Sequence, residues 1–132
     1  MWLFTVPETE RTLGSVIAWW ELRRTPYNLI VGSAGFVSLV IFFISIVSAN
    51  VLEPGEDAVE PLAIMFAPIA VNICYTAGWV VENVLWLVWP SKRHIWGPLL
   101  FKIGLGFSLF MVTLPALFWG GFRLLQVLGI QK

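Results

Sequence analysis

The sequence predicts an all-α integral membrane protein with three transmembrane helices, preceded by an N-terminal amphipathic helix at the membrane surface. Its 132 residues are 58% hydrophobic and only 12% charged, with a mean hydropathy of +0.83. Ordinary soluble domains carry about a quarter charged residues. Three stretches are also longer than the roughly 20 apolar residues that a helix needs to cross a hydrocarbon core. We therefore expect one membrane domain, residues 1–132, that lies in the lipid bilayer.

The first element is expected at residues 6–24 as an interfacial helix. The stretch Thr5-Val6-Pro7-Glu8 fits a capping box. Apolar side chains follow at helical spacing along one face, at Leu13, Val16, Ile17 and Trp20. Such a helix would lie along the inner membrane surface with Trp19 and Trp20 in the interface. The alternative is that it packs against the protein's own spans.

The three spans are expected at residues 27–49, 61–89 and 98–122. The first has no charged residue, the second only Glu82 and the third only Lys102. Backbone groups in lipid must be satisfied within the segment, so helices are the expected form. A proline stands at each predicted start, at Pro26, Pro61 and Pro98. Proline is favoured in the first helical turn, where its missing N–H has no partner to lose.

The distribution of basic residues predicts the orientation. Arg11, Arg23 and Arg24 precede the first span, and Lys92 and Arg93 separate the second from the third. The connection at residues 50–60 has four acidic residues and no basic one. Because basic residues near short flanks mark the cytoplasmic side, we expect a multi-pass protein of the cell's inner membrane. Its N-terminus would be cytoplasmic, with the first loop and the C-terminus outside.

The start of the chain does not look like a cleaved leader. The sequence MWLFTVPETE lacks the basic region that opens a secretory signal peptide. We therefore expect the first span to serve as an uncleaved anchor.

The second span carries a stripe of polar and aromatic side chains. At 100° per residue, one arc of about 120° contains all of them: Asn72, Tyr75, Thr76, Trp79, Glu82, Asn83 and Trp86. Polar groups in a spanning helix face the bundle interior or a wet cavity, because lipid offers them no partner. The stripe therefore predicts the inward face of this helix.

Glu82 and Lys102 are expected at similar depth on either side of a short connection. Three interpretations follow for them. They form an ion pair, or each is solvated separately at the interface, with Lys102 reaching the headgroups, or Glu82 handles protons or ions. A second group of residues is expected to contact lipid headgroups: Arg23, Arg24, Lys92, Arg93 and His94.

The sequence predicts neither an enzyme nor a metal or cofactor site. Hydrolase, zinc-protease and nucleotide-binding motifs are absent. One cysteine, Cys74, and one histidine, His94, are too few for a disulfide, a zinc site or a bis-histidine haem within the chain. The formal net charge of zero gives nucleic acid no basic footprint.

The expected function is that of a structural or accessory subunit that packs against other membrane helices. Its partners would be other membrane protein subunits or further copies of itself. The alternative is a component of a homo-oligomeric channel or transporter, with the polar stripe lining the path. A membrane enzyme is the third class, for which only Glu82, Lys102 and His94 could supply chemistry.

Overall fold

The computed structural model describes residues 2–6, 12–49, 61–89 and 93–129. Within these ranges every regular element is helical. In chain order they are η1 (Trp2–Phe4), α1 (Leu13–Ala49), α2 (Pro61–Val88), α3 (Arg93–Pro115), the π-helical turn η3 (Ala116–Gly120) and α4 (Gly121–Val127). Three continuous helical segments are long and apolar enough to cross a membrane: Leu13–Ser48, Ile64–Val88 and Ile95–Val127. The prediction of an all-helical chain with three such segments is confirmed.

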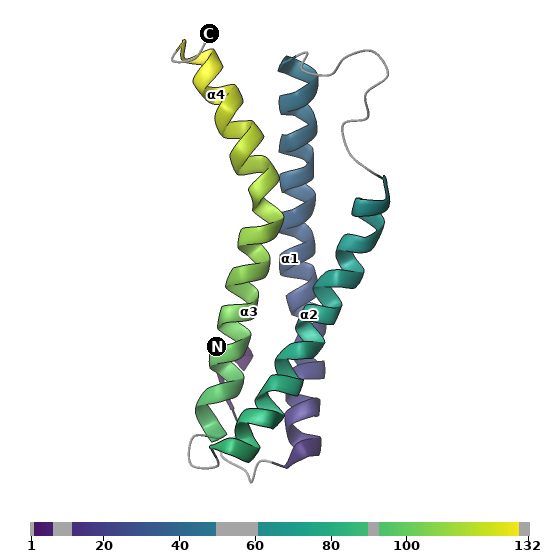
Figure 1. Cartoon of the computed structure of the whole chain (residues 1–132), viewed down its shortest axis with the longest axis vertical. Coiled ribbons are helices and arrows are strands. Elements are labelled where there is room, and N and C mark those ends of the chain that lie inside the picture. Colours follow the sequence, from purple (N-terminus) through teal and green to yellow (C-terminus); the bar gives the residue numbers. More distant parts are fainter. Residues whose placement is uncertain (1, 7–11, 50–60, 90–92, 130–132) are drawn as a thin grey trace.

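The three long helices form an elongated bundle (Figure 1). α1 and α3 begin at the same end, which we call the lower end, and α2 runs beside them in the opposite direction. α2 lies against its neighbours near the lower end and diverges from them towards its own start. The bundle is therefore closed at the lower end and spread at the upper end.

α1 does not begin where the sequence predicted. The helix is unbroken from Leu13 to Ala49 and passes through Pro26, so the expected boundary between an interfacial helix and the first span is wrong. Proline in a helix interior removes one backbone hydrogen bond. Packing offsets this loss, because Trp20 before the proline and Tyr27 after it are both 2% exposed in the same core. Residues 13–24 thus pack against the protein's own spans, as the alternative interpretation had it.

The N-terminus of α1 is capped by Thr12 and Ser15. The Ser15 N–H donates to Thr12 Oγ1 at 3.3 Å, and the Thr12 N–H donates to Ser15 Oγ at 2.9 Å. This is the reciprocal pattern of a capping box, with serine in place of the usual glutamate. The Thr5 hydroxyl donates to the Trp2 carbonyl at 3.1 Å, and the capping box expected between Thr5 and Glu8 stays a prediction. Glu8 lies outside the described residues.

The other two helices agree with the sequence prediction at some ends and differ at others. α2 begins at Pro61, as expected. α3 begins at Arg93, so Pro98 lies within the helix rather than at its start. Pro115 ends α3 and is followed by the π-helical turn η3, since its ring and missing N–H disrupt the α-helical pattern. The side chain of Ser38 accepts from the Ala116 N–H at 3.3 Å.

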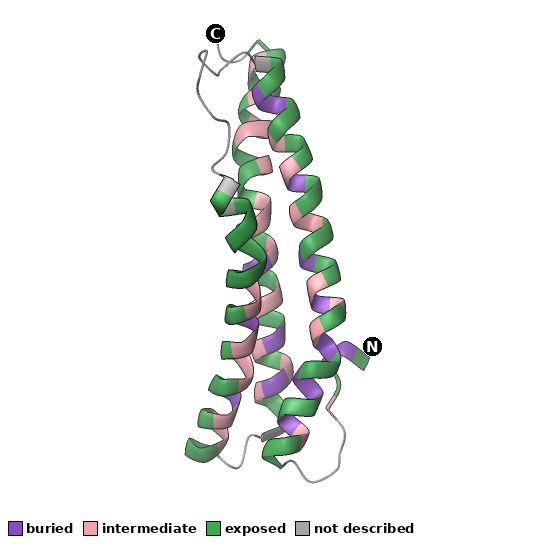
Figure 2. Cartoon of the chain, turned by 90° about the vertical axis from the view of Figure 1, so that its right-hand side faces the viewer, coloured by how far each residue is buried: buried purple, intermediate pink, exposed green. Residues whose placement is uncertain are grey.

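The core is aromatic and lies towards the lower end (Figure 2). Its buried apolar side chains are Leu3, Val16, Trp19, Trp20, Tyr27, Val31, Tyr75 and Phe101. The Phe101 ring lies within 6.3 Å, centroid to centroid, of five other aromatic rings. Edge-to-face contacts of this kind add to the free energy of burial. This core fixes the relative positions of α1, α2 and α3 at the level of the polar stripe.

Candidate functional site

The polar stripe of α2 lies against the rest of the chain at the lower end. Tyr75 and Glu82 are buried, 3% and 2% exposed. The other five members, Asn72, Thr76, Trp79, Asn83 and Trp86, are half-buried. On the opposite face Val84 and Val88 are 54% and 57% exposed. The stripe is thus the part of α2 that the other helices cover.

Trp20 of α1 is the main contact of the buried part. Its indole N–H donates to Glu82 Oε2 at 2.6 Å, and its backbone carbonyl accepts from the Tyr75 hydroxyl. The indole reaches this position because Gly78 has no side chain. A Cβ added at Gly78 would lie 2.6 Å from the Trp20 ring. One tryptophan therefore joins α1 to three consecutive turns of α2.

The expected ion pair between Glu82 and Lys102 is not formed. Lys102 is exposed, and its ammonium lies 5.3 Å from the centroid of the Phe4 ring. The rotation of α3 explains the difference. Phe101 takes the inward position, at 1% exposure, and the next residue is turned away by about 100°. The spacing along the chain predicted a similar depth for the two residues but could not predict this rotation.

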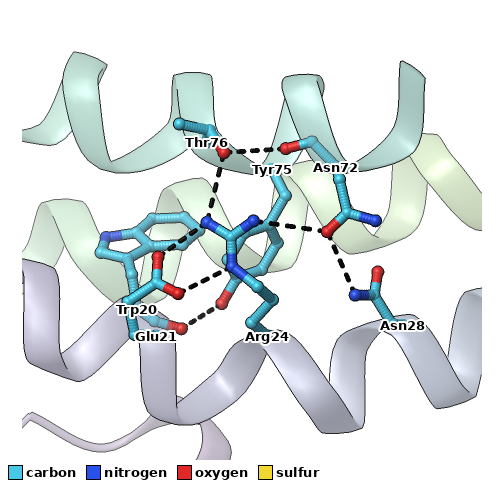
Figure 3. Close-up of polar contacts among 7 residues, drawn as sticks. All are labelled: Trp20, Glu21, Arg24, Asn28, Asn72, Tyr75 and Thr76. Atoms are coloured by element: carbon cyan, nitrogen blue, oxygen red, sulfur yellow. Dashed lines mark hydrogen bonds and ion pairs between the residues drawn. The ribbon is translucent and has the colours of Figure 1, made fainter. Parts of the chain in front are cut away.

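The outer part of the stripe forms a network with α1 (Figure 3). Arg24 donates to both carboxylate oxygens of Glu21, at 2.8 and 2.7 Å. It also donates to Thr76 Oγ1 at 3.2 Å and, at 3.4 Å, to Asn72 Oδ1. The Asn28 amide donates to the same Asn72 oxygen at 3.1 Å. The contact between Arg24 and the stripe could not be predicted from the sequence, since no local pattern links residues so far apart in the chain.

The lower part of the stripe includes polar atoms that lack a partner within the described ranges. The Asn83 amide donates to the Trp79 carbonyl at 2.9 Å. The Asn83 Oδ1 atom is buried and accepts no hydrogen bond from the described residues. The Trp79 indole N–H is also buried and donates no hydrogen bond to them. Most buried polar groups in proteins are paired, so this end of the stripe differs from the network around Arg24.

The basic residues expected at lipid headgroups take different positions. Arg23 is 5% exposed, which contradicts a headgroup contact. Its guanidinium donates to the carbonyls of Leu3, Trp2 and Thr5 and to the Trp19 carbonyl in its own helix. Backbone carbonyls leave no signal in a sequence, so this role could not be read from it. Arg24 is half-buried. Lys92 and the side chains of Arg93 and His94 lie outside the described residues.

A shallow groove of about 750 Å³ lies beside the network on the outer face of α2. Arg24 from α1 lines it together with α2 residues Pro68, Ile69, Asn72, Ile73, Thr76, Ala77, Val80 and Val81. Three of these side chains are polar and adjacent, whereas the rest of the lining is apolar. No group of three metal-ligating side chains occurs in the part of the chain that the structure describes. The chemistry that this arrangement offers is binding by hydrogen bonds, charge and apolar contact.

The fold and the site define a class rather than a particular protein: a helical chain with three segments of membrane-spanning length around an aromatic and polar core. In comparisons with protein-family models, curated proteins and solved structures, nothing matches this chain.

Proposed function

We propose that this protein is an accessory subunit of a membrane assembly and that it docks a transmembrane helix of another subunit against the upper half of α2. The observation behind the proposal is a change of burial along one face of this helix. Ile64, Val71, Tyr75 and Glu82 fall within about 40° of one another at 100° per residue. Glu82 and Tyr75 are buried, Val71 is half-buried and Ile64 is 43% exposed.

The upper half of α2 is not covered by any other helix that the structure describes. Every described side chain from Leu62 to Ala70 is exposed. Figure 1 shows α2 diverging from α1 and α3 over this stretch. The face that the chain buries at the lower end is therefore continued upwards by apolar side chains that no described residue buries. A partner helix that enters between α2 and the other two helices would extend the same packing.

Pro68 adds a polar reason for a partner at this level. Residue 68 has no N–H, so the Ile64 carbonyl loses its usual donor in the helix. Within a bilayer such freed groups are satisfied by neighbouring helices or ordered water. A hydroxyl or amide side chain on the partner helix could donate to this carbonyl. Interhelical hydrogen bonds in membranes contribute about 0.6 kcal/mol on average.

Site-specific photo-crosslinking in native membranes tests the proposal. A photoreactive residue at Ile64 should give protein adducts of discrete mass, because it faces the proposed partner. Leu62 is the matched control, since it lies at the same end of α2 and on the opposite face, 58% exposed. Protein adducts at Leu62 but not at Ile64, or at neither position, would contradict the proposal.

A homo-oligomeric channel or transporter is the second candidate. Asn72 and Thr76 line the outer groove, so copies that met there would place polar side chains between them. The interior of one chain offers less room, because Trp20 and Tyr75 fill the space next to Glu82. Adducts at Ile73 with twice the mass of the chain, and none at Ile64, would favour this candidate.

A further inference from the structure

We propose that the groove between Arg24 and the outer face of α2 binds a phospholipid whose headgroup carries both a phosphate and a primary ammonium, as phosphatidylethanolamine does. The groove combines an apolar wall with a few adjacent polar groups, which is the usual composition of a ligand site. Its volume of about 750 Å³ also lies within the range of such sites.

Arg24 is the group that would bind the phosphate. Guanidinium groups match the geometry of phosphate oxygens, and this side chain is 29% exposed at the groove. Its orientation is fixed by Glu21, Thr76 and Asn72, which accept from four of its five N–H groups. The remaining hydrogen on Nη1 has no acceptor among the described residues and is available to a ligand.

Glu21 determines which headgroup fits. Its carboxylate is 45% exposed and is paired with Arg24, so the site presents one positive and one negative group side by side. A headgroup with a net negative charge would meet repulsion from Glu21. A headgroup with a phosphate and an ammonium presents the complementary pair. A primary ammonium also donates hydrogen bonds to a carboxylate, which a quaternary ammonium cannot do.

The order of these groups along the helices agrees with the polarity of a phospholipid. Residues 25–49 of α1 carry no charge, so Arg24 borders the apolar run and Glu21 lies about one turn further from it. Towards the apolar side the groove is lined by Asn72, Ile73, Ile69 and Pro68. Ile69 and Ile73 are 54% and 64% exposed. The ammonium would thus lie outermost, the phosphate next and an acyl chain along α2.

Native mass spectrometry of the full chain tests the proposal with three lipids of identical acyl chains: phosphatidylethanolamine, phosphatidylcholine and phosphatidylglycerol. The wild-type protein should retain phosphatidylethanolamine about tenfold better than either of the others, the difference expected for roughly one charged hydrogen bond. Arg24→Gln should lower the retention of all three. Arg123→Gln, at the other end of the bundle, is the matched control and should behave as the wild type.

Glu21→Gln keeps the test decisive even if Arg24→Gln fails to fold, because Glu21 is exposed. Removal of its charge should move the preference from phosphatidylethanolamine to phosphatidylglycerol, a change that a purely structural role would not cause. Equal retention of the three lipids by the wild type would overturn the proposal. So would an unchanged preference in Glu21→Gln, or a lipid-free dimer that showed a second copy in the groove.

Discussion

Trp20 depends on a single missing side chain in α2. Its ring lies over Gly78 so closely that a Cβ there would be 2.6 Å from one ring carbon and 2.9 Å from another. Contacts under about 3 Å cannot be kept, so either the indole or α2 would have to move. Movement of the indole would break its hydrogen bond to Glu82, which is 2% exposed. Gly78 therefore controls both the helix spacing and the partner of a buried carboxylate.

Gly78→Ala should destabilise the protein. Overpacking costs about 1–3 kcal/mol, and a contact of 2.6 Å with an aromatic ring belongs at the upper part of this range. The cost is then larger than the roughly 1 kcal/mol that alanine gains over glycine in a helix. We expect a lower midpoint of thermal unfolding in detergent. Gly106→Ala is the matched control, because nothing lies within 4 Å of a Cβ at that position, and it should be neutral or slightly stabilising. Equal midpoints for the two variants would contradict the contact.

At the scale of single residues, the sequence predicted which groups share a face but not which groups meet. Helical spacing alone brought Tyr75 and Glu82 onto one stripe. Their partner, Trp20, lies 55 and 62 positions away in the chain, and the rotation of α1 about its axis decides that it meets them. The rotation of α3 likewise turns Lys102 outwards. Periodicity predicts the orientation of each helix towards a core, whereas the pairing across helices depends on packing that no local pattern records.

At the scale of elements, Arg23 joins the N-terminal segment to α1. It donates to the carbonyls of Leu3, Trp2 and Thr5 at 2.9, 2.5 and 3.2 Å. Its guanidinium also lies 3.9 Å from the centroid of the Trp19 ring. The planar guanidinium can direct several donors at different acceptors at once, and the ammonium of lysine cannot reproduce this pattern. The position of η1 therefore depends on arginine and not only on positive charge.

Arg23→Lys should loosen residues 2–6 while the helices remain. We expect faster amide hydrogen exchange in a peptide that covers these residues, with a loss of about 1–3 kcal/mol for the hydrogen bonds to the charged group. Arg24→Lys is the neighbouring control and should leave exchange in this peptide unchanged, since Arg24 contacts α2 instead. Unchanged exchange in Arg23→Lys would show that the aromatic contacts of Phe4 alone hold the segment.

Helix boundaries show where local signals fail. Pro61 begins α2 as a proline in the first turn is expected to do, but Pro26 and Pro98 lie inside helices. The three prolines look alike in sequence. They differ in their surroundings, because buried aromatic residues on both sides of Pro26 hold the helix together across it. A proline therefore predicts a helix start only where packing does not continue through it.

At the scale of the whole molecule, composition predicted the number of long apolar helices, and the structure agrees. Each contains a long run without a charged residue, and these runs were sufficient to find them. The spread of α2 from its neighbours could not be foreseen. Apolar side chains that face lipid, a partner or the chain's own core have the same composition, because the bilayer is itself an apolar solvent. Sequence therefore gives the class of architecture and leaves the shape of the bundle open.

The direction of the helices leads to a prediction about topology. α1 and α3 run parallel and α2 antiparallel (Figure 1), so the 50–60 and 90–92 connections join helices at opposite ends of the bundle. Basic residues beside the lower end favour a cytoplasmic position for it.

Cysteines at Glu56 and at Ser91, each in a Cys74→Ser background, should therefore react differently with a membrane-impermeant maleimide on intact cells. Glu56→Cys should be labelled and Ser91→Cys protected until the membrane is opened. Leu128→Cys, just after α4 at the upper end, should be labelled like Glu56→Cys. The reverse pattern would invert the orientation, and equal labelling of Glu56→Cys and Ser91→Cys would mean that α2 does not cross the membrane.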